Sequence, residues 1–100
     1  MHLNNKDLDK LILHYVGELA KQRHKRGLLL NYTEAVAYIS SEMMEMARDG
    51  RSVTEIMNLG TKILTKKDVM DGVSSMVHEV HVEATCLDGT KLITVHNPIQ

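Results

Sequence analysis

The chain has 100 residues, of which 43% are hydrophobic and 25% are charged, and its formal net charge is -1. This length fits one domain, and the balance argues against a disordered chain or a membrane span. A near-neutral chain lacks the excess of cations that binding to duplex phosphates requires. Three Tyr with no Phe and no Trp provide few rings for stacking on single-stranded nucleic acid. We therefore predict a single domain over residues 1–100, with neither nucleic acid nor a membrane as its partner.

The cysteine content and the first residues indicate a compartment. Cys86 is the single cysteine, which excludes an intramolecular disulfide and fits a reducing environment. The first ten residues are polar and lack the apolar segment of a cleaved secretion signal. We therefore expect a cytoplasmic protein.

The first predicted helix begins after Asn4 or Asn5 and ends at Gly27. Asn is a good helix N-cap, and Gly stops a helix by adopting a left-handed conformation. Apolar residues recur at intervals of three and four, which predicts one buried face made of Leu8, Leu11, Ile12, Tyr15, Val16 and Leu19. The apolar run at residues 28–30 that follows is predicted to be a buried connector.

Capping patterns predict the second helix. Asn31 followed by Glu34 is a variant of the capping box, and Asp49-Gly50 ends the helix. Its predicted apolar face contains Ala35, Val36, Ile39, Met43, Met46 and Ala47.

Two shorter helices are predicted next. Ser52 with Glu55 forms a capping box and opens a third helix that ends at Gly60. Thr65 is predicted to open a fourth helix, which runs through residues 69 and 70 and closes near Gly72.

The apolar pattern changes from helical to alternating at residue 80, and Asp88-Gly89 is a strong hairpin signal. A two-residue loop at this point would pair Leu87 with Thr90. One face of the predicted hairpin is then apolar, with Val82, Ala84, Cys86, Ile93 and Val95 on it. An isolated hairpin is marginal in water, so we expect it to lie on the helices or join another chain's sheet. The predicted fold class is α+β: an N-terminal bundle of about four helices followed by a C-terminal antiparallel β-hairpin.

One constellation on the polar face of the hairpin could hold a metal. His81 and His96 are expected to face each other, with Glu83 as a diagonal neighbour, which gives two imidazoles and one carboxylate. The alternative is an exposed polar or interface face. Cys86 lies on the apolar face and is predicted to be a core residue, not a nucleophile.

Other catalytic signals are missing from the sequence. There is no G-x-S-x-G nucleophile motif and no Gly-rich phosphate loop. The basic cluster from Lys21 to Arg26 either contacts an acidic partner or complements its own helix dipole. We therefore predict no catalytic, cofactor-binding or metal-binding residue on this chain.

Four blocks occur in a distinctive order along the chain. They are RGLLLNYTEAVA at residues 26–37, ARDG at 47–50, VMDGV at 69–73, and the segment from Val82-Glu83-Ala84-Thr85 to Pro98-Ile99. Together they closely resemble the urease gamma subunit, the smallest chain of bacterial urease, and the resemblance covers essentially the whole sequence. One departure is Cys86-Leu87, which stands where Phe-Pro is usual and removes a large packing group beside the hairpin turn.

The resemblance implies a function at the level of an assembly. Urease hydrolyses urea to ammonia and carbamate, and its large alpha subunit holds two nickel ions and the catalytic histidines. The resemblance thus implies a non-catalytic structural subunit, inactive alone and without a cofactor of its own. Its implied partners are the alpha and beta subunits and other gamma copies, in a trimer of heterotrimers.

Two other functions remain open from the residues. The Met-rich second helix and the basic end of the first fit a free-standing helical protein-binding module unrelated to urease. The trio of His81, His96 and Glu83 fits a small metal-dependent enzyme.

Overall fold

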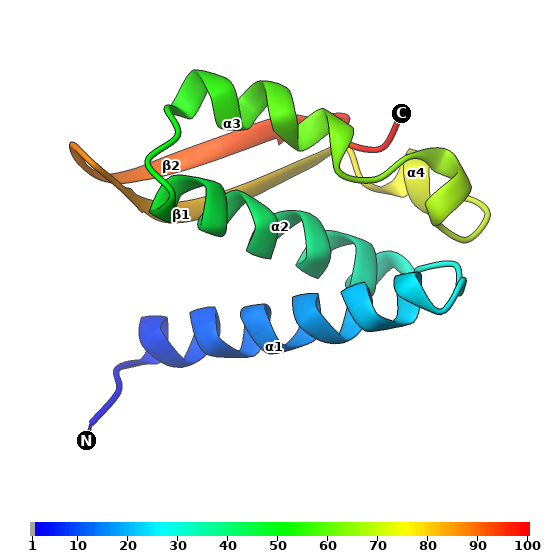
Figure 1. The fold of residues 1–100 in the computed structure, drawn as a ribbon, viewed down its shortest axis with the longest axis horizontal. Helices are drawn as coiled ribbons and strands as arrows, with labels where there is room; N and C mark the ends of the chain where they lie inside the picture. Colours follow the sequence, from blue (N-terminus) through cyan, green and yellow to red (C-terminus); the bar gives the residue numbers. More distant parts are fainter. Residues whose placement is uncertain (1) are drawn as a thin grey trace.

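The computed structural model describes residues 2–100 as helices followed by a hairpin (Figure 1). The helices are α1 (Asn5–Lys25), α2 (Tyr32–Arg48), α3 (Val53–Leu59) and α4 (Val73–Met76), with short 3-10 turns at Gly60–Lys62 and Lys66–Asp68. Strands β1 (Glu79–Cys86) and β2 (Gly89–His96) form an antiparallel two-stranded sheet. The predicted α+β fold class is therefore confirmed.

Capping boxes fix the starts of α1, α2 and α3. At α2, the backbone N–H of Glu34 donates to the Asn31 side chain at 2.9 Å, and the Asn31 N–H donates to the Glu34 carboxylate at 2.9 Å. The same reciprocal pattern occurs at Ser52 and Glu55 before α3. These boxes satisfy backbone donors that a helix leaves unpaired at its first turn, and both predicted starts are confirmed.

Helix α2 lies at the centre of the molecule, with α1 along one side and β1 packed on another, while β2 packs on α3 (Figure 1). Glycines permit two of these close contacts. A Cβ at Gly17 of α1 would lie 2.2 Å from the Ser41 Oγ of α2, and a Cβ at Gly60 would lie 2.6 Å from Val95 of β2. The largest fully buried side chains gather between these elements, and include Leu30, Ile39, Met43, Ile56, Leu64, Ile93 and Val95.

The predicted buried face of α1 is wrong for four of its six residues, whereas Val16 and Leu19 are partly buried. Leu8 is 44% exposed, Leu11 55%, Ile12 61% and Tyr15 70%, whereas the buried residues of α1 are Gly17 and Ala20. Small residues let α1 approach α2 closely, so the opposite side of α1 carries the larger apolar side chains. Periodicity identified an apolar stripe, but it could not tell which side of the helix meets the core.

The segments around the fourth helix also differ from prediction. Leu28 and Leu29 are half exposed, and only Leu30 of that run is buried. The Leu30 N–H donates to the Asp68 carbonyl at 3.0 Å, and the Met70 N–H donates to the Leu30 carbonyl at 2.9 Å.

This pairing with Leu30 makes residues 69 and 70 non-helical, with Val69 in extended backbone. The capping box at Thr65 and Asp68 therefore opens only the turn Lys66–Asp68. Helix α4 begins after Gly72, where the sequence had predicted a helix end.

The hairpin is present, but its register differs by two residues from prediction. Cys86 pairs with Gly89, so Leu87 and Asp88 form the loop. Gly89 has a φ of 120°, and neither loop residue has a positive φ. A favoured two-residue turn centred on Asp88-Gly89 would need a positive φ at Asp88. A shift of two keeps every side chain on its predicted face, and Val82, Ala84, Ile93 and Val95 are buried as expected.

Candidate functional site

The structure does not bring the predicted metal trio together. His81 lies opposite Thr94, and Glu83 lies opposite Leu92 and pairs with Lys6 at 3.3 Å. Glu79, which the sequence argument missed, lies opposite His96. Its Oε2 is 3.3 Å from the His96 Nδ1, and its Oε1 is 3.9 Å from the His81 Nδ1. The two-residue register error hid this contact, and a loop at Leu87-Asp88 would have revealed it.

The Glu79 cluster is an exposed set of carboxylate–imidazole contacts. All three side chains are about half exposed or more, and exposed polar contacts of this kind contribute little to stability. Within residues 2–100, no group of three or more His, Cys, Asp or Glu side chains could hold a metal ion. Cys86, which the sequence places in the core, is partly buried and packs against the edge of the hydrophobic cluster.

The basic end of α1 makes contacts within the chain. Arg23 donates to the buried Glu34 carboxylate at 2.7 Å, and a 2.9 Å hydrogen bond joins the His24 Nε2 to Asp68. Lys21 pairs with Glu42 of α2. Three of the cluster's side chains thus tie α1 to α2 and to the turn Lys66–Asp68, which favours a structural role.

These contacts shift the pKa values of the carboxyls. The hydrogen bond with His24 and a second from the Thr65 N–H lower the pKa of Asp68. Burial alone would raise the pKa of Glu34, but hydrogen bonds from the Asn31 N–H and the Arg23 guanidinium outweigh it and leave that pKa lowered. Both carboxyls are therefore held as anions, and each joins α1 to a neighbouring segment of the fold.

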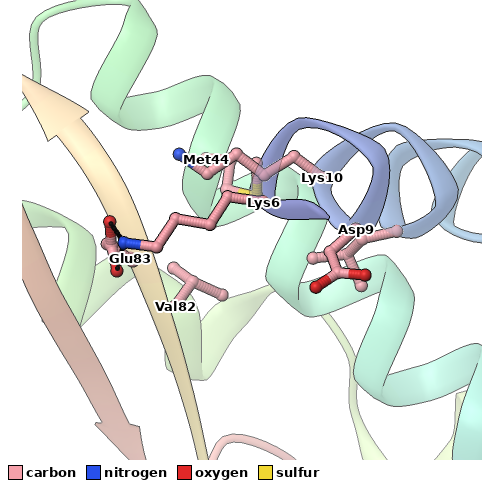
Figure 2. A pocket seen from close by; sticks show the side chains of 7 residues that line it. Lys6, Asp9, Lys10, Met44, Val82 and Glu83 are labelled. Carbon is pink, nitrogen blue, oxygen red and sulfur yellow. Dashed lines mark hydrogen bonds and ion pairs between the residues drawn. The ribbon is translucent and has the colours of Figure 1, made fainter. Parts of the chain in front are cut away.

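A groove lies between α1 and β1. One part of it has a volume of about 190 Å³, and its lining includes Lys6 and Leu13 of α1, Met44 of α2 and Val82 of β1. Figure 2 shows Lys6 reaching from α1 to Glu83 on β1, with Val82 beside them. The lining combines apolar and charged side chains and contains no nucleophile–base pair, so it suits binding better than catalysis.

The outer side of α1 is a second candidate surface. We call the exposed residues Leu8, Leu11, Ile12 and Tyr15 the α1 stripe. Four large apolar side chains on one helix face mark an interaction surface more often than a solvent-facing one.

Comparison with known proteins decides the family. A model described as "Urease, gamma subunit" matches residues 1–99. The urease subunit gamma of Actinobacillus pleuropneumoniae serotype 5b (strain L20) is 57% identical over 100 residues, which cover all of both chains. That of Haemophilus influenzae (strain PittGG) is 58% identical, again over all of both chains.

The chain belongs to the urease gamma-subunit family. It is accordingly a subunit of urease, a hydrolase complex, and the alternative of a binding module unrelated to urease is wrong. Membership also implies partnership with other urease subunits. None of the helices in residues 2–100 is long and apolar enough to cross a membrane.

Proposed function

We propose that this chain is a non-catalytic structural subunit of a nickel-dependent urease that hydrolyses urea to ammonia and carbamate. It packs on the large catalytic subunit and supports a trimer of alpha–beta–gamma units. The observation that carries this proposal is the α1 stripe, a large apolar face on a chain whose whole length matches a subunit family. An assembly partner would remove these side chains from water, which is favourable at about 25 cal/mol per Å².

The arrangement of metal-binding side chain types supports a subunit without an active site of its own. The nickel would be held by the large subunit, because the described donors of this chain do not gather into a metal site. We assign no catalytic, cofactor-binding or metal residue to this chain.

Residues 1–100 would act as one gamma-like domain. One hydrophobic cluster extends from Ala20 of α1 to Ile99 after β2 and supports this boundary. The cytoplasm is the proposed location, because the chain has a single cysteine and that side chain is a free thiol.

Co-expression tests the proposal. The full chain, expressed with the large and middle urease subunits, is expected to co-elute with them on size exclusion. The chain alone should show no urea hydrolysis, and leaving it out should reduce both the assembly and its activity. A large subunit that assembles and hydrolyses urea equally well without this chain would contradict the structural role.

A further inference from the structure

The outer edges of β1 and of β2 both lack a neighbouring strand within residues 2–100. The sheet contains only β1 and β2 within residues 2–100. The last paired residues of the strands are Glu79 and His96. Next to them, the Asn97 N–H donates to the His78 carbonyl at 2.7 Å, so His78 and Asn97 form a hydrogen-bonded pair. Bonded and non-bonded pairs alternate in an antiparallel ladder. The backbone N–H and C=O groups of His81, Glu83 and Thr85 therefore point away from β2, toward the open edge of β1.

The groove between α1 and β1 follows this open edge. The part that includes Val82 and Glu83 in its lining continues into a second part of about 350 Å³, lined by Ala84 and Thr85 among others. Both parts also include Met44 of α2. The groove thus passes successive residues of one strand edge, as a site for an added strand would.

Helix α1 provides the floor of this position. Strand β1 packs on α2 and β2 packs on α3, whereas α1 packs on the side of α2 (Figure 1). A third strand beside β1 would lie over α1, with Leu13 and Met44 beneath its inward-facing side chains. Charged side chains of α1 and α2 also line the groove, and they determine which charges an added strand could carry.

Two basic side chains in the groove lack an acidic partner. Lys10 lines both parts and Arg48 lines the second, and neither forms an ion pair within residues 2–100. The lining also contains Asp9, Glu45 and Glu83, of which Glu83 contacts Lys6 and Glu45 contacts His14. An Asp or Glu on the incoming strand would complement Lys10 and Arg48. In the register that pairs two copies of β1 about His81, Glu79 of each copy would lie opposite Glu83 of the other, so that register is disfavoured.

We propose that β1 accepts a third strand, an extended segment of another urease subunit that carries an acidic side chain toward Lys10 and Arg48. Backbone hydrogen bonds along the free edge would give affinity, and the charged wall would give specificity. The identity of the partner as a urease subunit rests on the proposed function.

Two proline variants of the full chain, co-expressed with the other urease subunits, test this strand addition. Thr85 and Thr90 are exposed cross-strand partners, and the N–H groups of both point to outer edges, one on each side of the sheet. A proline at either position removes an edge donor and leaves the ladder bonds between β1 and β2 intact. Thr85→Pro should weaken retention in the assembly at least tenfold, and Thr90→Pro, the matched control, should be retained like the wild type. Equal behaviour of the two variants would overturn the proposal.

A second measurement does not depend on a variant folding correctly. Hydrogen exchange at the amides of His81 and Glu83 should slow at least a hundredfold when the wild-type chain enters the assembly. Lys10→Glu with Arg48→Glu should weaken retention in the same way as Thr85→Pro. If the wild-type chain co-elutes but these two amides exchange as fast as in the free chain, strand addition is contradicted and the proposed function is not. A wild-type chain that does not co-elute contradicts the proposed function and, with it, the assigned partner.

Discussion

Gly27 ends α1 in a conformation that other residues adopt at a cost. Its φ is 87°, and a Cβ at this position would meet no atom within 4 Å. The cost of a substitution here therefore comes from the backbone alone. Gly27→Ala should lower the free energy of unfolding by about 1 kcal/mol, as thermal or urea unfolding would measure. Gly27→Asn serves as the control and should cost less, because Asn tolerates the left-handed region; equal stability of all three proteins would contradict this argument.

Gly17 is required for a different reason, the contact between two helices. A Cβ here would lie 2.2 Å from the Ser41 Oγ and 2.9 Å from the Ala37 carbonyl oxygen, and the latter is backbone that cannot rotate away. Gly17→Ala should therefore destabilise the chain by about 1–3 kcal/mol, although alanine is the better helix former. Gln22→Ala, on the exposed side of α1, should leave the melting temperature nearly unchanged. A Gly17→Ala protein as stable as the wild type would show that α1 and α2 can separate at little cost.

At the scale of elements, carboxylates join α1 to its neighbours and make the fold sensitive to acid. Glu34 accepts from Arg23, and Asp68 interacts with His24; both carboxyls have pKa values below their ordinary values of 4.5 and 3.8. A lowered folded-state pKa stabilises the fold above the unfolded-state pKa, and that stability is lost as pH falls through the folded-state value. The contribution of these two carboxyls to the free energy of unfolding should therefore be constant near neutral pH and should decrease below about pH 4.

A variant isolates the contribution of Glu34. Glu34→Gln should lower the free energy of unfolding at neutral pH by about 1–3 kcal/mol, because it removes hydrogen bonds to a buried charge. Its unfolding free energy should also fall less steeply in acid than that of the wild type. Glu45→Gln, which alters an exposed carboxylate of the same helix, is the control. Parallel pH profiles for Glu34→Gln and the wild type would exclude Glu34 as a source of the acid sensitivity.

The elements differ in how well the sequence predicted them. Helix starts were predictable because a cap is a local contact, such as that between Asn31 and Glu34. The fourth helix was misplaced because Leu30, nearly forty positions earlier, pairs with Val69 and holds it in extended backbone. The hairpin register was wrong because Asp88-Gly89 fits two turn geometries, of which only one is adopted.

At the scale of the whole molecule, the α1 stripe is the surface most in need of a partner. Leu11 and Tyr15 are more than half exposed on the side of α1 that faces away from the core. Leu11→Gln should weaken association with the other urease subunits at least tenfold, about 1.4 kcal/mol, with no loss of melting temperature in the free chain. Met76→Gln, at an exposed apolar position of α4, is the control for a change in surface polarity. Unaltered association of Leu11→Gln would remove the α1 stripe from the interface.

The sequence by itself determined the α+β class, the starts of the long helices, the faces of the hairpin and the family, because each depends on local contacts or on residue order. Only the tertiary structure decided which side of α1 is buried, because the small residues Gly17 and Ala20 allow a closer helix contact than the larger apolar stripe does. The tertiary structure also placed Glu79 beside His81 and His96 and left the β1 edge open over α1. These features depend on register and on packing between distant segments, which no local pattern encodes.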